Sequence, residues 1–271
     1  MPRAPLSVML GLLLPWCGAT VRAAGDADVA AAWELVARHL PADAQARLGA
    51  TPDGGREAAF AAAVVLLDRP PVTDAKLATA AAQLADLARG DDEIAAAAGY
   101  LEARLYQAHF FSPDPARAAR AYAALAARQP HSPWAQLGLV KLALLRLYVL
   151  PEPASPAARV AAAETLLAQV EIPALQRDLH LVLGRGRLFF QQPGALPHLL
   201  AADRIGGLAG TVRSDLQLQI AELSRRAGEP AQARRYFEAF LAENEVDPRV
   251  YTVRARLAAM AATPAGREGR P

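Results

Sequence analysis

The sequence predicts an all-α protein built from helical hairpins, and three observations carry this prediction. First, 53% of the 271 residues are hydrophobic while only 6% are aromatic, so alanine, the strongest helix former, supplies much of the apolar content. Second, from Asp26 onward apolar residues recur at intervals of three and four, with no alternating stretch typical of a strand. Third, Pro, Gly or Asp interrupts this pattern every 10–18 residues. Helices with short connections of this kind form αα-hairpins.

Residues 1–23 have the layout of a secretory signal peptide. Arg3 precedes an apolar run that reaches Cys17, and small residues surround Ala23. The run is too short to span a membrane, and bulky Trp16 before the cysteine argues against processing as a lipoprotein. A buried N-terminal helix is the alternative interpretation. We therefore expect a secreted or periplasmic protein without a lipid anchor.

Charge and cysteine content exclude several classes of function. Removal of Arg3 and Arg22 lowers the Lys+Arg total from 29 to 27, which equals the 27 Asp+Glu, so no basic surplus remains for nucleic acid. Cys17 is the only cysteine, so the mature chain would have no disulfide, Cys-ligated zinc or thiol nucleophile. No second apolar run is long enough to span a membrane. The excess of Arg over Lys is typical of GC-rich coding and favours a bacterial source.

The remaining chain divides into three parts. Residues 24–55 form an N-terminal helical segment, and residues 56–262 carry the repeated hairpins. Residues 249–262 make the last helix, whose arginines we expect on the exposed face of a terminal cap. The small, polar residues 263–271 are expected to be disordered.

Helix ends are predicted from their local chemistry. Thr51, Thr73 and Ser132 each precede a helical segment and can cap its free N–H groups. Gly90 and Gly228 follow helical segments, where a residue in the left-handed conformation commonly ends a helix.

The clearest hairpin runs from Leu216 to Leu241. Small Ala221 lies in its first helix, Gly228 at the turn, and Ala233 and Phe237 in its second helix. Small residues let two helices approach closely, while the aromatic ring fills the gap beside the next hairpin.

Related spacings occur earlier in the chain. They are W-x-x-L-G at Trp134, Leu137 and Gly138, H-x-x-L-G at His180, Leu183 and Gly184, and A-x-x-x-Y at Ala118 and Tyr122. Together with the 216–241 unit, these pieces resemble the tetratricopeptide repeat (TPR), whose pattern is W-x-x-L-G-x-x-Y, then A-x-x-x-F, then P. The resemblance implies a solenoid of αα-hairpins, wound as a right-handed superhelix.

The repeats are irregular. Second-helix alanines fall at positions 80, 118, 162, 195 and 233, separated by 38, 44, 33 and 38 residues, whereas the family period is about 34. Extra residues lie in the turns at 109–114 and 150–157, and Lys141 and Arg187 stand where the family has a first-helix aromatic. A related αα-repeat class or an irregular helical bundle remains an alternative.

No constellation of residues predicts catalysis, a metal or a cofactor. The five histidines lack metal-site spacing, and the glycine-dense stretches follow no strand, so neither a zinc nor a nucleotide motif is present. His180 replaces a repeat tryptophan and is interpreted as a packing residue. His109 and His131 flank one hairpin and could approach each other, although histidines in turns are common.

The predicted binding residues follow from the resemblance, because first helices line the concave face of such a stack. Arg185 and Arg187 could face that groove beside Phe189 and Phe190, with Lys141 at the matching position of an earlier hairpin. A planar guanidinium suits a peptide carboxylate or an acidic motif. The alternative is a solvated helix face.

The sequence therefore predicts an exported, non-enzymatic scaffold that binds a protein or peptide partner in the bacterial envelope. One alternative is a helical-toroid enzyme that processes cell-wall glycan, with Glu102, Glu164 or Glu222 as general acid. Another is a structural subunit of an envelope assembly, contacted through residues 27–55.

Overall fold

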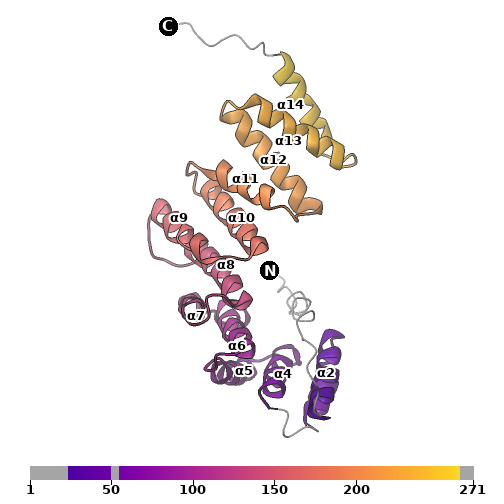
Figure 1. Cartoon of the computed structure of the whole chain (residues 1–271), viewed down its shortest axis with the longest axis vertical. Coiled ribbons are helices and arrows are strands. Elements are labelled where there is room, and N and C mark those ends of the chain that lie inside the picture. Colours follow the sequence, from indigo (N-terminus) through magenta and orange to yellow (C-terminus); the bar gives the residue numbers. More distant parts are fainter. Residues whose placement is uncertain (1–23, 50–54, 263–271) are drawn as a thin grey trace. The chain divides into compact units, whose positions relative to one another are not determined.

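The computed structural model describes residues 24–49 and 55–262, and within them every regular element is helical (Figure 1). The α-helices are α2 (Ala24–Ala37), α3 (Pro41–Gly49), α4 (Gly55–Asp68), α5 (Asp74–Leu87), α6 (Glu93–Arg104), α7 (Pro115–Arg128), α8 (Pro133–Tyr148), α9 (Pro156–Glu164), α10 (Pro173–Phe189), α11 (Ala195–Ile205), α12 (Gly210–Arg226), α13 (Pro230–Glu243) and α14 (Val250–Ala262). A π-helical turn, η2 (Leu105–His109), and a 3-10 turn, η3 (Leu167–Gln169), complete them. The all-α prediction is confirmed.

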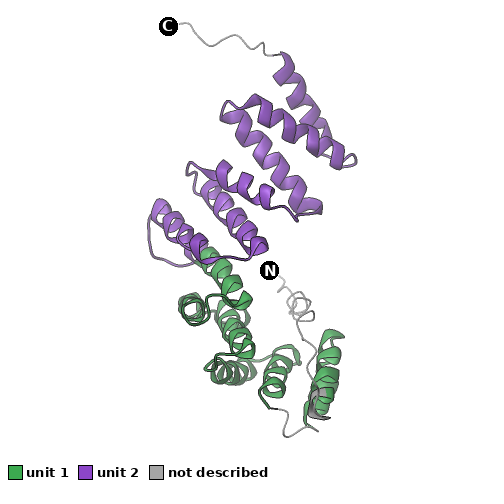
Figure 2. Ribbon diagram, in the orientation of Figure 1, with its two compact units in different colours: residues 1–145 green, residues 146–271 purple. Residues whose placement is uncertain are grey.

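The chain divides into two compact units, residues 1–145 and 146–271, with the division near the end of α8 (Figure 2). The predicted signal peptide, the Thr51 cap and the predicted tail lie outside the described residues. None of the described helices is both long and apolar enough to cross a membrane.

Several helices begin where a side chain accepts a hydrogen bond from a free backbone N–H group. The expected cap at Thr73 is present, since its Oγ1 accepts a hydrogen bond from the N–H of Lys76 at 3.3 Å. Ser132 Oγ likewise accepts from the N–H of Trp134, also at 3.3 Å. Each such cap stabilises its helix by about 1 kcal/mol.

The two predicted glycine stops differ. Gly228 is left-handed, with φ +77°, as expected after α12. The same prediction is wrong for Gly90, which is not among the glycines with positive φ. A Cβ there would lie 2.5 Å from Nη2 of Arg56, whose guanidinium crosses the turn to reach Leu87 O and Asp92. A side chain at position 90 would therefore displace the end of the flexible Arg56 side chain from this contact.

The first unit packs consecutive helices in pairs, α2 with α3, α4 with α5 and α6 with α7. Its aromatic core lies between α6, α7 and the start of α8. The ring centroid of Tyr100 is 5.9 Å from that of Tyr122 and 5.5 Å from that of Trp134. Gly138 allows this approach, because a Cβ on it would lie 3.0 Å from Cδ1 of Tyr122.

The second unit pairs α10 with α11 and α12 with α13, and α14 follows on α13. Ala221, Ala233 and Phe237 are buried in the core of this unit. Leu183 is fully buried as well. Gly184 brings α10 close to α11, since a Cβ on it would lie 2.7 Å from Cδ2 of Leu199.

Four of the five second-helix alanines have a common place in these pairs. Ala80, Ala118, Ala195 and Ala233 lie on the second helices α5, α7, α11 and α13, and all four are buried, whereas Ala162 lies on α9, outside the pairs named above. Ala162 is half-buried. Packing in consecutive pairs is compatible with a helical repeat.

The terminal helix follows its prediction in part. Arg254 and Arg256 are exposed on α14, while Val250 and Val253 are buried. Arg249, just before the helix, instead donates hydrogen bonds to Asp247 and Asp215.

Candidate functional site

An exposed group of aromatic side chains lies at the end of α10. The aromatic patch consists of Tyr148, Phe189 and Phe190, all in the second unit. The ring centroid of Tyr148 is 5.3 Å from that of Phe189 and 6.0 Å from that of Phe190. The two phenylalanine rings are 4.9 Å apart and nearly perpendicular. Phe189 is 69% exposed, so the group presents aromatic surface to solvent.

The local sequence explains why the rings gather there. A Cβ on Gly186 would lie 3.0 Å from Cδ1 of Leu147 and 3.5 Å from the hydroxyl of Tyr148, so the glycine gives α10 room to lie close to the end of α8. Directly after Phe190 the chain reverses through Gln191 and Gly194, which have φ values of +54° and +89°. The N–H of Gln192 donates to the carbonyl of Arg187 at 2.7 Å and closes the turn.

Positive charge borders the aromatic patch. Arg185 is exposed, and no carboxylate pairs with it among the described residues. Arg159 donates hydrogen bonds to the carbonyls of Leu147 and Pro151 at 3.3 and 3.0 Å, at the end of α8. Burial raises the pKa of Tyr148, with Arg185 acting in the opposite direction, so its phenol is neutral near pH 7.

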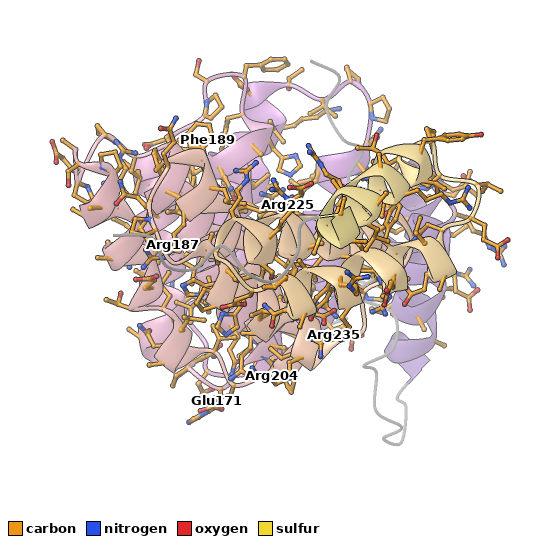
Figure 3. The ribbon with its side chains drawn as sticks, turned by 90° about the horizontal axis from the view of Figure 1, so that it is seen from above. Glu171, Arg187, Phe189, Arg204, Arg225 and Arg235 are labelled. Atoms are coloured by element: carbon orange, nitrogen blue, oxygen red, sulfur yellow. The ribbon has the colours of Figure 1, made fainter. Side chains whose placement is uncertain are left out.

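The predicted binding residues therefore do not all lie at one place. Arg185, Phe189 and Phe190 border or form the aromatic patch. Arg187 lies at a separate position along the end of α10 (Figure 3) and is half-buried. Its Nε donates to Oε1 of Glu164 at 2.9 Å, and its Nη1 donates to the carbonyl of Pro193 at 2.6 Å. The guanidinium of Arg187 is thus already hydrogen-bonded to groups of the same chain. Lys141 is half-buried in the first unit.

A chain of polar side chains continues from Arg187. The carboxylate of Glu164 also lies 2.9 Å from Nε2 of His198, and Nδ1 of His198 lies 3.1 Å from Nδ1 of His180. These four residues, here called the polar chain, come from α9, α10 and α11. None of the four is fully exposed.

The electrostatics of the polar chain are set by burial and by its own charges. Burial of Glu164 opposes its ionisation, but hydrogen bonds from Arg187 and His198 outweigh burial and hold the pKa of the carboxyl below its usual value. Burial, then the charges of His198 and Arg204, lower the pKa of His180. Near pH 7 the polar chain therefore holds an ionised Glu164 and a neutral His180.

Sequence reasoning missed the polar chain, because its contacts depend on how one helix is aligned with the next. The repeat pattern predicts only a packing role for His180, whereas its contact with His198 spans 18 residues. The close approach of Gly184 to Leu199 sets the register of the hairpin and brings His180 to His198. The register itself could not be fixed from a single sequence.

The carboxylates considered for catalysis are engaged with arginines. Glu164 has a lowered pKa, whereas a general acid needs a raised one. Glu222 pairs with Arg225 at 3.1 Å and with Arg256 at 3.2 Å. Burial raises the pKa of Glu102, and Arg117 lies 3.9 Å away. The pKa shift of Glu102 has the direction that a general acid requires, and that of Glu164 has the opposite direction.

No group of three or more His, Cys, Asp or Glu side chains is placed to hold a metal ion in residues 24–49 and 55–262. Comparison with protein-family models, curated proteins and solved structures finds no match. The likeness to the tetratricopeptide repeat thus rests on the residues quoted above and on the paired packing of the helices.

Proposed function

We propose that the protein is an exported, non-enzymatic scaffold of the TPR-like solenoid type, which binds a protein or peptide partner in the bacterial envelope. The observation that carries the proposal is the aromatic patch. Exposed aromatic clusters with a polar rim are typical of protein-interaction sites. A rigid hairpin that presents such a cluster needs no catalytic group to act.

The chemistry of the aromatic patch suits a particular kind of partner segment. Covering the side chain of Phe189 would contribute about 1.5–3 kcal/mol from apolar burial. Arg185, which has no carboxylate partner of its own in the described residues, can pair with an acidic group at the rim. A segment that combines apolar side chains with a carboxylate would satisfy both.

Substitution of Phe189 tests the proposed site. With the full chain as bait in envelope extract of its own host, we expect Phe189→Ala to weaken capture of the main partner about thirtyfold, the size of a 2 kcal/mol interface hot spot. Tyr251→Ala is the matched control, because Tyr251 is 80% exposed on α14 of the same unit. Equal capture by wild type and both variants would place the interface elsewhere, with residues 27–55 as the next segment to substitute.

Export makes a separate prediction. Cells that express the full chain should release a periplasmic or secreted form whose mass lacks residues 1–23, because the apolar run and small residues there fit signal cleavage. Intact mass measured on cell fractions checks it. A full-length protein retained in the cytoplasm would contradict the assignment to the envelope.

A further inference from the structure

We propose that His180 and His198 form a proton-operated latch, which holds α9, α10 and α11 together near neutral pH and opens in mild acid. This inference concerns the second unit alone and does not depend on the proposed function. It begins from the contact between the two rings.

The two histidine rings have the geometry of a single hydrogen bond between their Nδ1 atoms. The Nδ1 atoms are 3.1 Å apart, and the ring centroids are 5.3 Å apart, only 2.2 Å more. The two rings therefore point almost directly at each other, as a hydrogen bond requires. A metal ion bound by both nitrogens would lie off this line, and the rings would turn toward it with their centroids closer together.

Glu164 fixes which nitrogens carry protons. Its ionised carboxylate can only accept, so Nε2 of His198 must donate to it. In the proposed latch, Nδ1 of His198 has the lone pair and accepts, and His180 donates to it from its own Nδ1. His180 is left with the lone pair on its Nε2.

The number of protons on the two rings determines when the hydrogen bond between them is lost. One added proton can occupy Nε2 of His180, and the hydrogen bond between the two Nδ1 atoms survives because His198 still has its lone pair. A second added proton leaves both Nδ1 atoms protonated, and neither can accept. Two positively charged rings would then face each other, so the contact must break.

The neighbouring charged groups determine how easily both histidines become protonated. Glu164 from α9 faces His198 but is shared with Arg187 from α10, and Arg204 from α11 acts against a charge on His180. Turn η3 carries no charged residue. Four charged residues of α12 form ion pairs away from the histidines, namely Arg213 with Glu243, Asp215 with Arg249, and Glu222 with Arg225 and Arg256. One shared anion therefore opposes two cationic rings.

The sign of the pH dependence follows from the two shifted groups. The pKa of His180 is lowered from 6.5 on folding, so the unfolded chain takes up the proton first and stability falls as the pH drops below 6.5. The pKa of Glu164 is lowered from 4.5, and its stabilisation is lost only as the pH falls below that value. The histidine pair therefore acts at milder pH than the carboxylate.

The latch is joined to the turn after Phe190. Arg187, at one end of the polar chain, holds the carbonyl of Pro193 with its guanidinium and the N–H of Gln192 with its own carbonyl. When the histidines separate, His198 no longer holds Glu164 in place from α11, and Glu164 in turn positions Arg187 less firmly. We expect the turn between α10 and α11 to loosen with them.

Side-chain nitrogen NMR on the full chain tests the proton positions directly. Near pH 7.5 we expect His180 with its proton on Nδ1 and His198 with its proton on Nε2. On acidification His180 should take up its additional proton below the ordinary histidine range, because burial and neighbouring charges lower its pKa. Detection of His180 with its proton on Nε2 at neutral pH would overturn the latch.

Substitution separates the latch from general acid sensitivity. In His180→Asn, the amide can donate to neutral His198 or accept from charged His198, so the contact no longer depends on pH. We expect protection of the 190–192 amides from hydrogen exchange, which donate backbone hydrogen bonds in this turn, to fall about tenfold from pH 7 to 5 in wild type and not in this variant. His39→Asn, a control in the first unit, should behave as wild type. Equal loss in all three proteins would overturn the latch, and neither readout requires a partner.

Discussion

Phe237→Ala should destabilise the second unit by about 3–5 kcal/mol, the usual result of truncating a buried Phe side chain. Phe237 is 1% exposed and packs in the core with Leu199, Ile220 and Phe240. The free energy of unfolding of an ordinary domain is about 5–15 kcal/mol, so this loss is a large part of the total stability.

Hydrogen exchange of the α12 and α13 amides measures this loss within the unit itself. We expect protection to fall at least about a hundredfold, which corresponds to about 3 kcal/mol. Tyr251→Ala, which truncates an exposed aromatic of the same unit, should change the free energy of unfolding by about 0.5 kcal/mol or less. Equal effects of the two substitutions would mean that Phe237 is not the packing centre of this hairpin.

Gly184→Leu should force α10 away from α11 and cost about 1–3 kcal/mol or more by overpacking. A Cβ at this position lies 2.7 Å from Cδ2 of Leu199 and 3.4 Å from the carbonyl oxygen of Ala195. Leu199 is fully buried, so its side chain has little room to move aside.

A double-mutant cycle with Leu199→Ala distinguishes this close contact from a general effect on the helix. Leu199→Ala alone should cost about 2–5 kcal/mol, and clearly less in the Gly184→Leu background, where the larger side chain fills the vacated space. Gly49→Leu is a suitable control, because nothing lies within 4 Å of a Cβ at Gly49. Strict additivity of Gly184→Leu and Leu199→Ala would contradict the assigned packing of α10 on α11.

Much of the fold could be predicted because its signals are local. The three- and four-residue spacing of apolar side chains predicts helices whatever their partners, and Thr73 caps its helix through atoms only three residues apart. The second-helix alanines are recognisable for the same reason. Gly90 shows the limit of local reasoning, since the side chain that lies against it comes from Arg56, 34 positions earlier.

The candidate site could be predicted only where it depends on one helix. Phe189 and Phe190 are adjacent, and the sequence alone marks them as a group. Tyr148 joins them from α8, and Glu164 occupies Arg187 from α9. Both contacts depend on the register between helices, which no single-sequence pattern encodes.

Site-specific photo-crosslinking from position 189 tests the central claim most directly. A crosslinking amino acid placed at Phe189 of the full chain, in cells of the native host, should yield one dominant adduct with an envelope protein. The same amino acid at Tyr251, which is also exposed on the second unit, should not yield that adduct. Adducts of equal yield from both positions, or none from position 189, would contradict a partner site at the aromatic patch.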